Sequence, residues 1–417
     1  MTPTYACEAM IGVGHGIRDR MSRLWDKGAP LDQRVLQYTA GEDYALDDRL
    51  VRHDIRASLA HAQMLHAQGL LAAADLVAIS AGLETLGETH ARDEWRVELA
   101  DEDGQTALEK RLTAAIGPAG GRVHLGRSRN DQVLTALRLY LREASETLAT
   151  GCEAVATALD RMAQRQGAIA LPGYTHMQQA MPSSVALWCG GFASELRDDA
   201  AGLRAVRRRA GRNPLGSAAG YGTPGLPLDR DATTRALGFD STQEPVTAVQ
   251  LSRGKAEAQL LFEITLCMQD LGRLAADLLL FYTQEFAFVD LPDAFTTGSS
   301  IMPQKRNPDV FELLRGRSAS ALGCLSEALA LCAKLPSGYQ RDLQLLKAPL
   351  FRGIDFCQQS LDIMGPALDA LQFQAEHIAM DPAVHAASEA YDLVVKEGLP
   401  FREAYRRVAS RLKSSAE

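Results

Sequence analysis

Evenly spaced apolar positions dominate the middle of this chain. From Leu134 to Met162, apolar residues recur three or four positions apart without a break. Such a stripe follows one face of an α-helix, and it predicts a single helix of roughly 35 residues, about 50 Å long. Similar patterns run from Ser183 to Arg209, from Val246 to Phe288 and from Asp309 to Lys334. Helices of this length are typical of bundles and coiled coils.

The alternation of apolar and polar residues that predicts β-strands is nearly absent. A shorter helical pattern runs from Leu46 to Leu71, and the glycine-rich stretch 117–121 ends that region. A chain of 417 residues is too long for a single core. We therefore predict an all-α, three-domain subunit. Its parts are an N-terminal helical domain over residues 1–120, a central bundle of long helices over 121–370 and a short C-terminal helical domain over 371–417.

Composition narrows the class of protein. Apolar residues make up 46% and charged residues 23%, which is ordinary for a globular protein. The net charge of −8 argues against a nucleic-acid partner. No apolar run approaches the ~20 residues that a membrane span requires, and the N-terminus lacks the pattern of a secretory signal. The seven cysteines are dispersed without a CxxC pair, so we expect reduced, mostly buried thiols in a cytoplasmic protein.

The first of four polar stretches is HLGRSRNDQ, residues 124–132, at the predicted start of the longest helix. Its capping residues leave backbone N–H groups and Asn130 at the positive end of that helix, which suits a carboxylate ligand. Taken alone, the stretch is better interpreted as a capped helix start with its arginines in solvent.

The second stretch is GYTHMQQAMPSS, residues 173–184, shortly before the next helix. It carries His176 between Thr175 and Gln178. An imidazole with an ordinary pKa of ~6.5 is suited to proton transfer near neutral pH. The alternative is a structural histidine.

The third stretch is GSSIMPQKRNPD, residues 298–309, and Glu312 follows it on the next predicted helix. Gly298 lets the backbone swing, Ser299 and Ser300 offer hydroxyl oxygens, and Lys305 supplies a compact positive charge. A loop of this composition is suited to closing over an anionic substrate. The alternative is an ordinary solvated turn.

The fourth stretch, LPSGYQRDLQLLK over residues 335–347, holds Tyr339, Arg341, Gln344 and Lys347. Gln344 and Lys347 share a face if this part is helical; the alternative is an amphipathic segment with solvated charges. No phosphate-binding loop, dinucleotide fingerprint or HExxH zinc motif occurs. A histidine pair five apart, His61 with His66, is interpreted as helix surface, so we expect no metal site.

Taken together, these motifs resemble those of the argininosuccinate lyases. The shared strings are GRSRNDQ, GYTH-Q, PLG followed later by DR, GSS-MPQK-NPD-E-LRG and Y-RDLQ-K. GSS-MP-K-N alone indicates the aspartase/fumarase superfamily, whereas GRSRNDQ with Y-RDLQ-K points to this member. The resemblance covers roughly residues 40–405. It implies a homotetramer whose active sites each draw loops from three subunits. It also implies a cofactor-free cleavage of argininosuccinate to arginine and fumarate, a step of arginine biosynthesis.

The resemblance also implies roles for individual residues. His176 and Ser299 match the catalytic histidine and the serine of the mobile loop, and Glu312 matches the acid that pairs with the histidine. We expect Ser299 to act as the base, with Lys305 stabilising its oxyanion, and His176 to protonate the departing nitrogen. The opposite assignment of base and donor stays open. The expected substrate-binding residues are Arg129, Asn130, Thr175, Asn307, Tyr339, Arg341, Gln344 and Lys347.

Several positions depart from the family pattern. Gln105 stands where the family has a histidine, and a glutamine cannot titrate. The family's substrate-contacting serine falls on Asp43, Gln179 replaces the commoner arginine, and the chain stops soon after Ala404. These changes keep two alternatives open. One is a related C–N lyase that releases fumarate from another N-substituted aspartate; the other, less favoured, is a non-catalytic structural protein of the crystallin kind.

Overall fold

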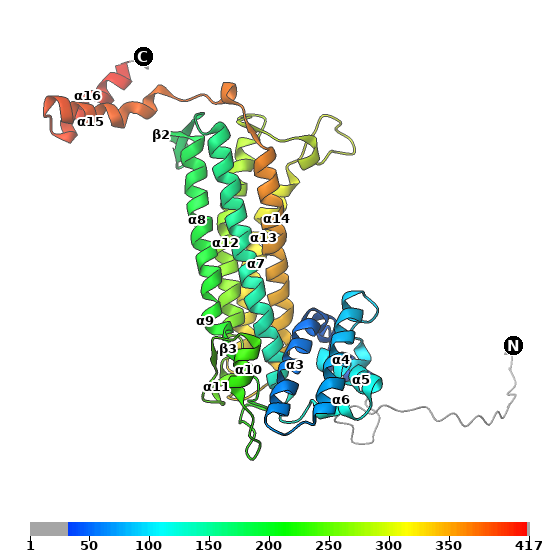
Figure 1. Ribbon diagram of the computed structural model, residues 1–417. Coiled ribbons are helices and arrows are strands. Elements are labelled where there is room, and N and C mark those ends of the chain that lie inside the picture. The colour runs from blue at the N-terminus through cyan, green and yellow to red at the C-terminus, as the bar shows by residue number, and fades with distance from the viewer. Residues whose placement is uncertain (1–31, 415–417) are drawn as a thin grey trace, which may run out of the picture.

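Five long helices form the centre of the computed structural model, which describes residues 32–414 (Figure 1). The all-α class and the central bundle are thereby confirmed. The N-terminal stretch, on which the absence of a secretory signal was predicted, and Cys7 lie outside the described residues. The five helices are α7 (Arg129–Gln166), α8 (Val185–Ala205), α12 (Lys255–Phe281), α13 (Asp309–Cys332) and α14 (Lys347–Ala370).

Helix α7 is the element that the apolar stripe predicted most directly. It runs for 38 residues, which corresponds to about 57 Å at the rise of an α-helix. A capping box starts it: the Ser128 side chain accepts from the backbone near the helix start, and the Asp131 side chain accepts from the Ser128 N–H. The predicted stripe from Leu134 to Met162 is buried, apart from Ala144, which is partly buried. The prediction of one long helix is confirmed.

The stripes of the five helices meet in one continuous apolar core. Residues such as Leu148 on α7, Leu196 on α8, Leu271 on α12 and Met364 on α14 are all 1% exposed or less. Six cysteines lie among the described residues, and all are free thiols. Five of them are buried and Cys332 is partly buried, as the sequence predicted for reduced cysteines. Among residues 32–414, no helix combines the length and apolarity needed to cross a membrane.

The prediction of one helix from Val246 to Phe288 is wrong. A short helix, α11 (Ala248–Leu251), is separated from α12 by three residues, Ser252 to Gly254, and α12 ends at Phe281. Gly254 has a φ of +82°, a left-handed conformation that favours glycine and breaks the helix. The break places Arg253 between α11 and α12, outside both helices.

Replacing Gly254 with alanine is expected to destabilise the fold by about 2–4 kcal/mol. The added Cβ would adopt a disfavoured φ and would overlap the Sγ atom of Cys332. Gly365 on α14 is a matched control, because nothing lies within 4 Å of a Cβ added there. Urea denaturation of the two variants measures the difference; equal stability of both would contradict the packing described here.

Short strands occur although the sequence pattern predicted almost none. The largest pair is an antiparallel hairpin of β1 (Ala170–Thr175) and β2 (Gln178–Ser184) between α7 and α8. The polar stretch 173–184 is therefore mostly strand, and its reading as a loop before a helix is corrected. The remaining pairs are two residues long: β3 (Arg212–Asn213) with β4 (Ser241–Thr242), and β5 (Val289–Asp290) with β6 (Gln372–Phe373).

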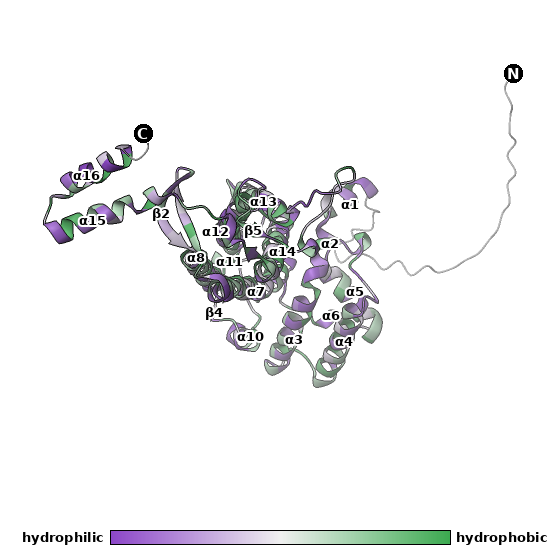
Figure 2. Ribbon diagram, turned by 90° about the horizontal axis from the view of Figure 1, so that it is seen from above, coloured by the Kyte–Doolittle hydropathy of each residue, from purple (hydrophilic) through white to green (hydrophobic). Residues whose placement is uncertain are grey.

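Smaller helical units flank the bundle on opposite sides, as the view down its axis shows (Figure 2). The N-terminal unit packs around its own buried cluster, which includes Leu65, Ile79 and Leu112. The C-terminal hairpin of α15 (Ala386–Glu397) and α16 (Phe401–Ser414) has a small cluster of its own. The boundaries of the three domains stay a prediction. The N-terminal helices are α1 (Gln33–Ala40), α2 (Asp43–Asp47), α3 (Val51–Ala67), α4 (Ala73–Ala91), α5 (Gly104–Ile116) and α6 (Ala119–Arg122).

The up-and-down course of the long helices decides where each polar stretch lies. The start of α7 and the segment before α14 lie at the lower end of the bundle in Figure 1. The β1–β2 hairpin and the loop before α13 lie at the upper end, on different sides. The sequence motifs are thus sorted to opposite ends of one subunit. Short helices α9 (Arg207–Ala210) and α10 (Arg230–Leu237) complete the lower end.

Candidate active site

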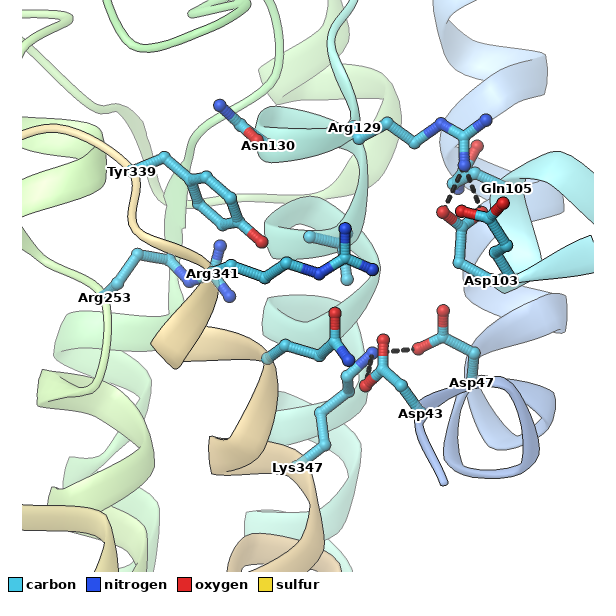
Figure 3. A pocket seen from close by; sticks show the side chains of 13 residues that line it. Asp43, Asp47, Asp103, Gln105, Arg129, Asn130, Arg253, Tyr339, Arg341 and Lys347 are labelled. Carbon is cyan, nitrogen blue, oxygen red and sulfur yellow. Dashed lines mark hydrogen bonds and ion pairs between the residues drawn. The ribbon is translucent and has the colours of Figure 1, made fainter. Parts of the chain in front are cut away.

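A cavity of about 230 Å³ at the lower end brings together six residues that the sequence predicted to bind substrate (Figure 3). They come from the first turn of α7 and from the segment that leads into α14, more than 200 residues apart in sequence. Carboxylates from the N-terminal helices line the facing wall. The six predicted residues are Arg129, Asn130, Tyr339, Arg341, Gln344 and Lys347.

The segment 341–347 is helical, which places Gln344 and Lys347 on the side of the cavity as expected. A 3-10 helix spans Arg341–Leu346 and continues directly into α14. The side chains of Arg341 and Gln344 both donate to the carbonyl oxygen of Thr39, at 2.9 and 3.0 Å. This shared acceptor at the end of α1 fixes the N-terminal unit against the cavity wall.

Lys347 is buried between two carboxylates. Its Nζ lies 2.6 Å from an Asp43 oxygen and also pairs with Asp47. Burial alone would lower the pKa of Lys347, but the two carboxylates outweigh it and raise that pKa. Burial raises the pKa of Asp43 to about 7, with Lys347 opposing and Asp47 adding to the rise. The Lys347 ammonium group is therefore paired with two carboxylates. Asp43 binds a proton as the pH falls through about 7.

Stability is expected to depend on pH through Asp43. Its folded-state pKa of about 7 lies above the unfolded value, so the folded state binds the extra proton between about pH 4 and pH 7. This extra proton stabilises the folded state fully below about pH 4. The stabilisation, on the order of a few kcal/mol, is lost as the pH rises through 7. The variant Asp43→Ser should therefore lose less stability than the wild type between pH 5 and pH 8. Thermal melts across this range measure the difference; parallel profiles would contradict it.

Gln105, which replaces the family's histidine, is part of a buried polar chain. Its Nε2 donates to Asp54, and its Oε1 accepts from the Gln132 side chain at 2.9 Å. Burial raises the pKa of Asp54 well above its ordinary value. Nearby, Arg129 forms an ion pair with Asp103 and donates to the Thr106 hydroxyl. Arg129 thus contributes little free positive charge to the cavity.

The second group of predicted residues lies on the hairpin at the upper end. His176 and Met177 form the two-residue turn between Thr175 and Gln178, with φ values of +53° and +61°. Positive φ at both turn positions is normally the place of Asn or Gly, so a histidine here stores strain of the kind found at functional sites. The His176 side chain is exposed at the hairpin tip. The hairpin thus presents the imidazole outward.

Gln179, noted above as a departure, anchors this hairpin. Its side-chain amide donates to the Ala379 carbonyl and accepts from the Asp381 N–H, each at 2.9 Å. The replacement therefore has a structural role in the described chain, between the hairpin and the segment that leads to α15.

The third group lies on the loop before α13. Paired backbone bonds between Thr297 and Asn307, at 3.0 and 2.8 Å, close the base of this loop. Within it, the Ser299 hydroxyl oxygen accepts from the backbone N–H groups of Met302 and Ile301, at 3.2 and 3.4 Å. Lys305 is exposed on the same loop, and Glu312 is exposed on the first turn of α13. Lys305 and Glu312 border one hollow together with Asn307, and Ser299 is not among the residues that line it.

The three groups do not meet within one chain. Asn130 stands at the start of α7 and the hairpin follows its end, about 57 Å away along the helix. The expected pairing of His176 with Glu312 is likewise not formed inside a single described chain, where no hydrogen bond or ion pair joins them. None of the four predicted catalytic residues lines the lower cavity.

Several cavity residues were missed by sequence reasoning. Asp47 lies one helical turn after Asp43 on α2, and Glu102 and Asp103 precede α5. Arg253 was missed because its segment was predicted to be helix interior. The sequence signal was the glycine that follows it, Gly254, inside an otherwise periodic stretch.

Comparison with known proteins gives the family. Residues 29–323 match the model of a family described as lyase. The argininosuccinate lyase of Sorangium cellulosum is 47% identical over 392 residues, which cover 94% of this chain and 90% of the relative. That of Stenotrophomonas maltophilia is 42% identical over 398 residues, covering 94% and 91%.

Solved structures agree with the fold. An EDDS lyase in complex with formate superposes with a TM-score of 0.79 at 26% identity, covering 93% of this chain and 77% of that one. A class II fumarase from Schistosoma mansoni superposes with a TM-score of 0.75 at 18% identity, covering 92% and 91%, and shows the fold alone. The chain belongs to the argininosuccinate lyase family, whose members are carbon–nitrogen lyases.

Proposed function

We propose that this lyase cleaves argininosuccinate to arginine and fumarate at sites that several copies of the chain build together. The proposal rests on the positions of the motifs at opposite ends of the bundle. Asn130, Tyr339 and Gln344 line a cavity at the lower end. His176 and Ser299 belong to the hairpin and the loop at the upper end. A complete site needs both sets, because binding residues without a proton carrier cannot perform an elimination. Antiparallel packing of bundles from different copies brings opposite ends together.

Exposed apolar side chains on the bundle support this assembly. Phe262 and Leu266 on α12 lie one helical turn apart and are 48% and 39% exposed. Leu313, Leu322 and Leu329 on α13 are 49–64% exposed. Rows of large apolar residues on neighbouring long helices mark a protein–protein contact surface. We propose a homotetramer, in the cytoplasm, acting in arginine biosynthesis.

The mobile-loop serine is suited to the role of base. The elimination removes a proton from the succinyl carbon next to the one that carries the guanidino nitrogen. Two backbone N–H groups already point at the Ser299 oxygen, so an oxyanion there is stabilised without reorganisation. Lys305, exposed on the same loop, adds a positive charge for that oxyanion and for the dianionic, enolate-like intermediate.

The second half of the reaction breaks the carbon–nitrogen bond. The electron pair left on the deprotonated carbon forms the double bond of fumarate, and the bonding pair leaves with the guanidino nitrogen. His176, exposed on its strained turn, donates a proton to that nitrogen, and Glu312 of another copy orients the imidazole. The reverse assignment, with His176 as base and Ser299 as donor, uses the same residues.

The test is an absorbance assay for fumarate release from argininosuccinate, adenylosuccinate and aspartate in parallel. Argininosuccinate is expected to be turned over far more efficiently than the other two. Negligible turnover of argininosuccinate by folded, assembled protein would overturn the proposal.

A second candidate substrate is another N-substituted aspartate. Asp43 beside Lys347 favours it, because the added carboxylate opposes binding of an anionic group at that position. This chain is similar in structure to an EDDS lyase, of which a variant has also been solved with bound fumarate. EDDS is therefore a further substrate to test in the same assay. Preference for EDDS over argininosuccinate would favour this candidate.

A further inference from the structure

Arg253 is a buried arginine whose charge lacks a partner of its own. It lines the lower cavity, is only 6% exposed, and lies in the break before α12. Its Nε and Nη1 atoms are buried and make no hydrogen bond in the described structure. Its guanidinium carbon lies 5.7 Å from the centre of the Tyr339 ring, a cation–π contact. A buried guanidinium with unmet N–H groups is costly unless an anion binds to it.

Arg253 lies within electrostatic range of a second buried guanidinium, that of Arg138. Arg138 and Glu257 act electrostatically on each other, and Arg253 acts on the same Arg138. Arg138 is 2% exposed and Glu257 is 1% exposed, so Arg138 has a buried carboxylate near it, whereas no ion pair with Arg253 occurs among the described residues. Arg138 is further held by the Ser252 hydroxyl at 2.6 Å. A like charge near a buried guanidinium with unmet N–H groups favours an anion that enters from the cavity and binds Arg253.

The other cations of the cavity are less able to bind a carboxylate. Lys347 is shared by Asp43 and Asp47, and Arg129 is paired with Asp103. Arg341 is exposed and donates to a backbone carbonyl. Asp43 thus adds a second carboxylate to a lysine that Asp47 already pairs, and Arg253 is the buried cation of this cavity for which no ion pair is found among the described residues.

We propose that Arg253 binds the α-carboxylate at the arginine end of argininosuccinate and thereby selects leaving amines that carry a carboxylate. This inference rests on the proposed function. Tyr339 and Gln344, which line the same cavity, are among the residues expected to bind the substrate. Ser299 and Lys305, proposed to act on the succinyl carbon, lie at the other end of the bundle, so the lower cavity is left for the arginine end. A bidentate guanidinium–carboxylate pair is geometrically specific, which a point charge such as Lys347 is not.

The experiment compares two substrates and two enzymes. One substrate is argininosuccinate and the other is its decarboxylated analogue, made from agmatine, which lacks only the α-carboxylate. With the wild type, the analogue is expected to show a KM about 10- to 100-fold higher at similar kcat. In Arg253→Gln, the KM for argininosuccinate should rise by the same factor, whereas the KM for the analogue should stay unchanged.

Matched controls separate this role from a loss of folding. Arg212→Gln changes an arginine outside the cavity and should leave both KM values unaltered. Arg253→Lys retains the charge but loses the bidentate geometry and should restore part of the discrimination. An equal loss with both substrates in a folded Arg253→Gln enzyme would overturn the inference, and so would an unchanged KM for argininosuccinate. If the wild type releases no fumarate from argininosuccinate, the proposed function itself fails.

Discussion

The variant Ser299→Ala is expected to lower kcat for fumarate release by about 10²- to 10⁴-fold with little change in KM. The hydroxyl removed is the one whose oxygen already accepts two backbone N–H bonds on the loop before α13. If Ser299 is the base, this variant also stops exchange of the succinyl β-hydrogen with solvent. Steady-state kinetics and the loss of deuterium from labelled substrate measure the two effects.

Ser300 provides the matched control, because it is an exposed hydroxyl one residue away on the same loop. The variant Ser300→Ala should retain most of the activity. The variant His176→Asn should lose turnover but keep the exchange, since the proton is removed before the nitrogen departs. Exchange that survives in Ser299→Ala and disappears in His176→Asn would reverse the assignment of base and donor.

Two inactive variants mixed together are expected to regain activity. The variant His176→Asn damages only the upper end of a subunit, and Asn130→Ala damages only the cavity at the lower end. When mixed subunits assemble, some sites take the intact lower end of one variant and the intact upper end of the other. Those sites are complete, so the mixture should show activity well above either variant alone.

The measurement is the fumarate assay on the two variants after they are unfolded together, refolded and allowed to assemble. The control pairs Asn130→Ala with Gln344→Ala, two changes at the same end of the bundle. That pair should stay inactive, because no arrangement supplies an undamaged lower end. Activity in neither mixture would contradict a site that is shared between copies.

Much of the architecture could be predicted from the chain alone because helical periodicity is a local property. The stripe from Leu134 to Met162 predicted α7, and the capping residues at Ser128 predicted where it begins. The prediction failed where local signals competed. A single glycine at position 254 ended a helix that periodicity would have continued, and a polar stretch around His176 formed strands whose pairing depends on a partner segment.

The sequence by itself determined which residue types the chemistry has available and on which segments they lie. Only the tertiary structure decided which of these side chains lie together. Lys347 pairs with two aspartates, Arg253 is buried beside Tyr339, and the segments that carry His176 and Ser299 lie at the opposite end of the bundle. The physical reason is that charge pairing and burial depend on contacts between segments hundreds of residues apart. Helix length and direction set those contacts, and they carry each motif to one end of the bundle.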